Sequence, residues 1–230
     1  VSEYYFSTKL AEVRKLQSEG HEIINLGIGS PDLPPHPDVI DELHKAAQKE
    51  ENNGYQSYRG IKELRLALTE WYKRIYGVSL NPENEVLPLI GSKEGIMHIL
   101  MAFCNPGDGV LIPNPGYPAY TSVSKLLNLD ILYYDLTENN NWIPDIDELE
   151  SLWKKGCKVM WINYPHMPTG KVADKENLKK IVLWAKHRNV LLVNDNPYSL
   201  ILNENTESIL SFLSVYNDVI ELNSLSKSHN

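Results

Sequence analysis

Apolar residues along this chain follow two alternating patterns, helical spacing and short continuous runs. The first helical stretch places Leu10, Val13 and Leu16 on one face and stops at Gly20. The spacing predicts helices over residues 2–19, 37–50, 61–76, 96–103, 117–127, 146–153 and 175–187. The short runs predict strands over residues 22–26, 85–89, 110–112, 130–135, 158–163, 190–194 and 218–222.

Strands that alternate with helices predict an α/β fold. The connections between them are expected to be right-handed crossovers, which give a mostly parallel sheet with helices on both faces. In such sheets ligands bind beyond the carboxyl ends of the strands. The residues that directly follow each strand are therefore the candidates for a functional site.

The composition is that of an ordinary globular chain of 230 residues, with 42% hydrophobic and 23% charged residues. A net charge of −8 argues against a nucleic acid or an acidic membrane surface as partner. The sequence shows no membrane-spanning apolar run and no signal-peptide pattern, so the cytoplasm is the expected location. The seven histidines show no metal-ligand spacing, and no metal is expected.

Small residues follow the predicted strand at 85–89, in the sequence Gly91-Ser92-Lys93. At the start of a helix they expose free backbone amides, which suits a phosphate group. The alternative is a plainly capped helix with Ser92 as its N-cap. The earlier pair Gly27-x-Gly29 lacks the third glycine of a dinucleotide-binding loop.

Chemically useful side chains follow several other predicted strands. Tyr117 could stack on a flat aromatic ligand or pack at a domain seam, and Asn163 could bind a ligand or hold a turn. Asp195 follows a buried apolar run, where an acid is costly unless it is paired, so it favours a cation or a ring N–H. Tyr198 could point into the same cavity.

Lys227 lies after the last predicted strand, between Ser226 and Ser228. Lysine forms Schiff bases with carbonyl compounds, although a solvated loop lysine is the simpler alternative. Together, the strand ends supply an anion site, an aromatic ring, an acid, a phenol and a nucleophilic amine. Pyridoxal phosphate (PLP) needs all five.

The chain resembles the class I/II aminotransferases of the aspartate aminotransferase superfamily, which are fold type I PLP enzymes. Six motifs carry the resemblance in the family's order: Gly29-Ser30-Pro31-Asp32, Tyr55 with Gly60, Gly91-Ser92-Lys93, Tyr117, Asp195-x-x-Tyr198 and Ser224-x-Ser226-Lys227. The resemblance implies a three-layer large domain over residues 40–230, preceded by an N-terminal arm and partial small domain over residues 1–39. It also implies a homodimer with shared active sites.

The resemblance assigns each motif to one part of the cofactor. Gly91-Ser92-Lys93, Ser224 and Ser226 would hold the phosphate, which Tyr55 would reach from the neighbouring subunit. The remaining assignments concern the ring, the aldehyde and the substrate: Tyr117 stacks on the ring, Asp195 contacts its nitrogen, Tyr198 contacts the 3′-oxygen, Lys227 forms the Schiff base, and Gly29 lies near the substrate carboxylate.

Two features depart from the family pattern. Met167 stands where the family has the asparagine that binds the cofactor's 3′-oxygen, and methionine cannot donate that hydrogen bond. The chain also stops three residues after Lys227, so we expect the C-terminal part of the large domain and the family's two binding arginines to lie outside it.

The expected function is transamination between an amino acid and a 2-oxo acid through Lys227, with Asp195 and Tyr198 as further catalytic residues. Two alternatives stay open: another fold type I PLP enzyme, such as a lyase or decarboxylase, and a non-catalytic PLP-binding sensor domain.

Overall fold

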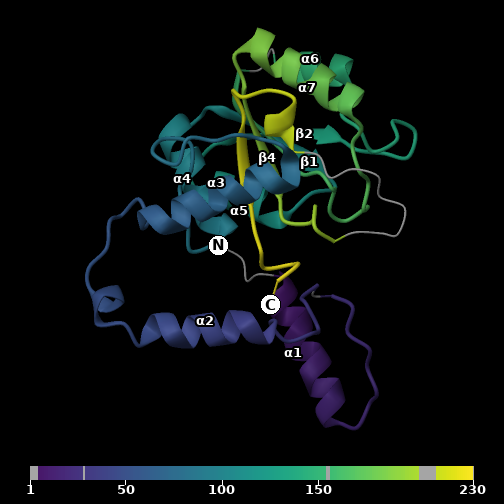
Figure 1. Ribbon diagram of the computed structural model, residues 1–230. Helices are drawn as coiled ribbons and strands as arrows, with labels where there is room; N and C mark the ends of the chain where they lie inside the picture. The colour runs from purple at the N-terminus through teal and green to yellow at the C-terminus, as the bar shows by residue number, and fades with distance from the viewer. Residues whose placement is uncertain (1–4, 28, 154–155, 202–210, 230) are drawn as a thin grey trace.

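The computed structural model describes residues 5–27, 29–153, 156–201 and 211–229 (Figure 1). Its α-helices are α1 (Tyr5–Ser18), α2 (Pro37–Ala47), α3 (Lys62–Tyr76), α4 (Ser92–Phe103), α5 (Pro118–Leu126), α6 (Ile146–Trp153) and α7 (Lys175–Arg188). Two short 3₁₀ helices are η1 (Glu50–Asn53) and η2 (Phe212–Ser214). The strands are β1 (Gly109–Asn114), β2 (Asp130–Asp135), β3 (Cys157–Ile162), β4 (Leu191–Asn196) and β5 (Ile220–Asn223).

The five strands form one sheet in the order β2-β1-β3-β4-β5, and every described pair is parallel. This confirms the predicted α/β class. The chain builds outward from β1 to β2, and then returns to the other side of β1 with β3. The order therefore reverses between β1 and β3, and such a reversal opens a crevice at the carboxyl ends of the strands.

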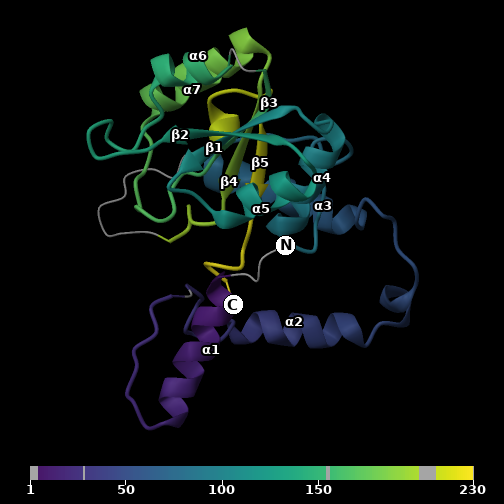
Figure 2. The same cartoon turned by 180° about the vertical axis from the view of Figure 1, so that it is seen from behind.

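Helices cover both faces of the sheet and give it three layers (Figures 1 and 2). Successive strand residues point to opposite faces, as β3 shows. Val159 and Trp161 belong to the apolar core under α4 and α5. Met160 and Ile162 belong to the core under α6 and α7. Because both faces are buried, β3 reads as a continuous apolar run rather than an alternating one.

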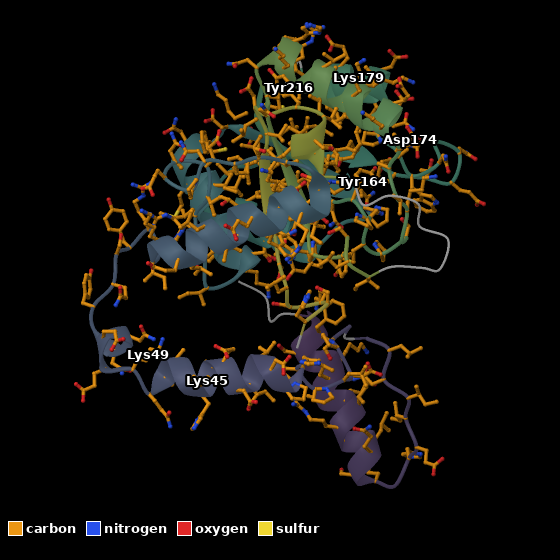
Figure 3. All side chains as sticks on the ribbon, viewed as in Figure 1. Lys45, Lys49, Tyr164, Asp174, Lys179 and Tyr216 are labelled. Carbon is orange, nitrogen blue, oxygen red and sulfur yellow. The ribbon has the colours of Figure 1, made fainter. Side chains whose placement is uncertain are left out.

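Helices α1 and α2 lie apart from the sheet and its covering helices, as both ribbon views show (Figures 1 and 2). Helix α2 buries none of its residues, and its apolar side chains Val39, Ile40 and Leu43 are all exposed. Lys45 and Lys49 lie on this separate part of the chain, far from Tyr216 in the three-layer body (Figure 3). The domain boundary between residues 39 and 40 stays a prediction.

Two predicted strands are wrong. Residues 22–26 and 85–89 form no strand, because neither segment has a neighbouring strand to complete its backbone hydrogen bonds. Ile24 and Leu26 are exposed rather than packed. Leu89 instead packs against the core under α4, a helix that begins at Ser92 and not at residue 96 as predicted.

No helix within the described ranges has the length and apolar character needed to cross a membrane.

Gly109 at the start of β1 has no room for a side chain. Its amide donates to the Gly156 carbonyl over 3.1 Å, and an added Cβ would overlap that carbonyl oxygen. Gly109→Ala should therefore lower the free energy of unfolding by about 3 kcal/mol, measured by urea denaturation.

The matched control is Gly54→Ala, since Gly54 has an ordinary φ of −81° and no atom within 4 Å of the added Cβ. Equal stability of the two variants would show that β1 and the turn before β3 are not packed as described.

Candidate functional site

A cavity of about 280 Å³ lies beyond the carboxyl ends of β1, β3, β4 and β5, where the strand order predicted a crevice. It brings together most of the residues proposed from the sequence, which come from five separate segments of the chain. Its lining comprises Gly91, Ser92, Lys93, Tyr117, Tyr120, Asn163, Met167, Asp195, Pro197, Tyr198, Ser224, Ser226 and Lys227.

Helix α4 points its N-terminus at one end of this cavity. Its N-cap is Gly91, in extended backbone conformation and without a side-chain capping bond, so the alternative with Ser92 as N-cap is wrong. A glycine N-cap leaves the first amides of the helix without a side-chain acceptor, while the helix dipole favours negative charge there. With Ser92 and Lys93 also in the lining, this end of the cavity suits an anion.

Asp195 is the buried acid of the site, 4% exposed near the end of β4. Its Oδ2 accepts a hydrogen bond of 2.8 Å from the Tyr120 hydroxyl. Its Oδ1 is buried and has no hydrogen-bond partner among the described residues. Burial raises the pKa of Asp195 to about 6, while the Tyr120 hydrogen bond acts in the opposite direction. A buried carboxylate oxygen without a donor fits a ligand that brings a positively charged ring N–H.

Asn163 lines the cavity, but its amide already bonds to the backbone on both sides. The Nδ2 group donates to the Asp195 carbonyl, and Oδ1 accepts from the Met167 amide over 2.7 Å. These two bonds hold the loop after β3 against the end of β4. A direct bond from Asn163 to a ligand stays a prediction, and Met167 presents its thioether side chain in the same lining.

Two tyrosines supply the aromatic and phenolic parts of the site. Tyr117 is the N-cap residue of α5, and its ring meets the Tyr120 ring edge-on with 5.6 Å between centroids. The Lys93 ammonium lies 6.0 Å from the Tyr117 ring centroid. Burial first, and then the charge of Asp195, raise the pKa of Tyr198 above its usual value. Tyr198 therefore stays protonated at neutral pH and can donate a hydrogen bond.

Lys227 lies in the turn after β5, with its side chain in the lining of the cavity. Its Nζ donates to the Gly29 carbonyl over 2.7 Å, which joins two segments almost 200 residues apart in sequence. In the same turn, the Ser226 amide donates to the Ser224 hydroxyl over 3.2 Å. Gly29 is thus beside the Lys227 amine, although it is not part of the cavity lining.

Tyr55 does not reach this cavity, and its side chain is fully exposed after η1. Its predicted role requires a second copy of the chain. In contrast, Tyr120 contacts Asp195 directly and was missed by sequence reasoning. The sequence could have indicated Tyr120 through its position three residues after Tyr117, because residues three apart lie on the same face of a helix.

Comparison with known proteins identifies the family. The model of aminotransferase class I and II matches residues 21–230. This chain belongs to that family. The similar relatives include LL-diaminopimelate aminotransferases from Dehalococcoides mccartyi (strain ATCC BAA-2266 / KCTC 15142 / 195) and Aquifex aeolicus (strain VF5). The first is 42% identical over 97% of this chain and 58% of the relative, and the second 41% identical over 99% and 59%.

Solved structures agree with this membership of the aminotransferase family. Substrate-bound BacF from Bacillus subtilis superposes with a TM-score of 0.91 at 35% identity, over all of this chain and 58% of that one. A probable N-succinyldiaminopimelate aminotransferase from Thermus thermophilus gives a TM-score of 0.88 at 34% identity, over 98% of this chain and 61% of that one. The chain thus spans about three-fifths of the length of these relatives.

The raised pKa of Asp195 predicts how the cofactor-free protein responds to pH. The folded state holds this proton more tightly than the unfolded state, so stability should fall as pH rises from 3.8 to about 6. A shift of this size corresponds to about 3 kcal/mol. Asp195→Asn should remove most of that fall, measured as the urea midpoint between pH 4 and pH 7.

Asp174→Asn provides the control for this measurement. Asp174 is the N-cap of α7, and its pKa is lowered, chiefly by the hydrogen bond from the Asn177 amide. Asparagine caps helices about as well, so the control should keep the wild-type fall. The same fall in Asp195→Asn as in wild type would contradict the proposed burial of Asp195.

Proposed function

We propose that this protein is a PLP-dependent aminotransferase that moves an amino group between an amino acid and a 2-oxo acid. The observation that carries the proposal is the cavity itself, in which a buried acid with one free oxygen faces the same space as Lys227. Membership of the aminotransferase family supports the reading.

The lining residues fit each part of PLP. The N-terminus of α4 at Gly91-Ser92-Lys93, with Ser224 and Ser226, would hold the phosphate. At the ring, Tyr117 would lie against the face and Asp195 would accept a hydrogen bond from the N–H. At the ring substituents, Tyr198 would donate to the 3′-oxygen and Lys227 would bond to the aldehyde carbon. When bound, the cofactor supplies an electron sink for the bond broken at the substrate Cα.

The chain's own groups then divide the work of the reaction. Asp195 would hold the proton on the ring nitrogen, and its buried position would strengthen that ionic hydrogen bond. The Lys227 amine would be the base that moves the Cα proton. Met167 offers no hydrogen-bond donor, so Tyr198 carries the 3′-oxygen more nearly alone.

The names of the relatives indicate which substrate to examine first. Several relatives at 41–42% identity are LL-diaminopimelate aminotransferases. We therefore propose LL-diaminopimelate as the first amino donor to test, with a 2-oxo acid as acceptor.

A homodimer with shared sites completes the proposal. Tyr55 is fully exposed on the part of the chain that lies apart from the sheet, together with the unburied helix α2. In a two-fold dimer this part of each subunit can pack against the other subunit, because the same contacts occur twice across the symmetry axis. We propose that Tyr55 reaches the phosphate of the partner's cofactor.

Lys227→Ala tests the catalytic assignment in the protein expressed at its full natural length. The variant should bind PLP without a borohydride-reducible link and release no 2-oxo acid from LL-diaminopimelate, because the substitution removes the amine that would bond to the cofactor and move the Cα proton. Mass spectrometry of the reduced protein and a 2-oxo acid assay measure the two effects.

Lys125→Ala, a lysine near the end of α5 and outside the cavity, is the control and should behave as wild type. Wild-type turnover in Lys227→Ala would refute the assignment. Decarboxylation or elimination by wild-type protein, without amino transfer to an acceptor, would favour the lyase or decarboxylase alternative.

Mixing a Tyr55→Phe variant with a Lys227→Ala variant tests the shared site. Tyr55→Phe should weaken phosphate binding, and Lys227→Ala should abolish turnover. After unfolding and refolding of an equal mixture, about half of the dimers are hybrids, and each hybrid has one complete site. The mixture should recover about a quarter of wild-type activity at cofactor levels that do not saturate Tyr55→Phe. No recovery above the mean of the separate variants would place Tyr55 outside the partner's site.

A further inference from the structure

Tyr120 is a buried tyrosine that no motif assigned to the site. It lies on α5, one turn after Tyr117, and is fully buried. Its hydroxyl donates to Asp195 Oδ2 over 2.8 Å, across a sequence separation of 75 residues. The bond therefore joins the helix that follows β1 to the end of β4.

The position of the Tyr120 ring is fixed by its neighbours. It stacks on Trp161 of β3 with 4.9 Å between centroids and an angle of 7° between the ring planes. Tyr117 also contacts it, with the two ring planes nearly perpendicular at 84°. Aromatic pairs favour these offset and edge-on arrangements, and both rings belong to the close-packed core under α4 and α5. The hydroxyl consequently has little freedom to leave Asp195.

The chemistry of Tyr120 restricts it to one role in this bond. Burial first, and then the charge of Asp195, raise its pKa well above the usual tyrosine value. The phenol therefore keeps its proton and acts as the donor, with Asp195 as the acceptor. The same bond opposes the effect of burial on Asp195 and favours its ionised form.

The two oxygens of Asp195 are consequently unequal. Oδ2 is occupied by Tyr120, whereas Oδ1 is buried without a partner among the described residues. A free carboxylate could rotate and exchange its oxygens, but a carboxylate held at one oxygen presents the other in a fixed direction. Asp195 lines the cavity together with Tyr117 and Lys227.

We propose that Tyr120 is a positioning residue, which aims Asp195 Oδ1 at the cofactor's ring nitrogen and keeps Asp195 ionised, so that Oδ1 accepts a hydrogen bond from the protonated ring nitrogen. This inference rests on the proposed PLP-dependent function. It makes a specific claim about recognition, namely that Tyr120 contributes to the binding of PLP only when the ring contains a nitrogen.

The test compares two probes, PLP and its 1-deaza analogue, which has a carbon in place of the ring nitrogen and keeps the aldehyde and phosphate. Dissociation constants are measured with cofactor-free, full-length protein by the quenching of tryptophan fluorescence. Tyr120→Phe should reduce the preference for PLP over the analogue on the order of tenfold, since a hydrogen bond to a charged group is lost. Affinity for the analogue should change little.

Tyr134→Phe is the matched control. Tyr134 is also fully buried, and its hydroxyl donates to the Trp161 carbonyl over 2.8 Å without touching Asp195. Its removal costs a buried hydrogen bond of the same kind but should leave the preference for PLP unchanged. If Tyr120 had a purely structural role, Tyr120→Phe would lower the affinities for PLP and for the analogue in parallel.

The outcomes separate the inference from the function on which it rests. A wild-type protein that binds neither probe would contradict the proposed function. A wild-type preference for PLP that survives in Tyr120→Phe would overturn the inference. If Tyr120→Phe does not fold by circular dichroism, Trp161→Phe reduces the stack that holds Tyr120. That variant should then lower the preference in the same direction by a smaller factor, and an unchanged preference would equally overturn the inference.

Discussion

A carboxylate buried near the end of an interior strand constrains the residues around it. Asp195 is 4% exposed, and an ion removed from water is stable only when donors surround it. The protein supplies one donor, from Tyr120, and leaves the second oxygen without a partner among the described residues. A ligand with a cationic N–H would supply the second donor.

The parallel sheet explains why the other groups lie within reach of that acid. All five described strands end at one edge, and the order reverses between β1 and β3. Turns after β1, β3, β4 and β5 consequently face one cavity, and Gly91 and the start of α4 lie at the end of it that suits an anion. The side-chain amide of Asn163 holds the loop after β3 against the β4 backbone, and so fixes the shape of the cavity wall.

The sequence predicted the features that depend on local pattern. The five strands that pair were recognisable as apolar runs, and their parallel order followed from the helices between them. Residues 22–26 and 85–89 have similar runs but form no strand, since strand formation depends on a neighbour that the local sequence does not reveal. Tyr120 was missed for a similar reason. Its partner is distant in sequence, and only the fold brings α5 to the end of β4. Tyr55 was recognised by motif, but its exposed position gives it no partner within one chain's cavity.

The central claim is that Asp195 receives a protonated ring nitrogen, and nitrogen NMR tests it directly. Full-length protein would be loaded with PLP labelled with ¹⁵N at the ring position and examined at mildly alkaline pH, above the pKa of about 6 for Asp195 without the cofactor. We expect the ring ¹⁵N to show the chemical shift of a protonated pyridinium, because an ionised and buried carboxylate stabilises that proton. The shift of a neutral pyridine would contradict it.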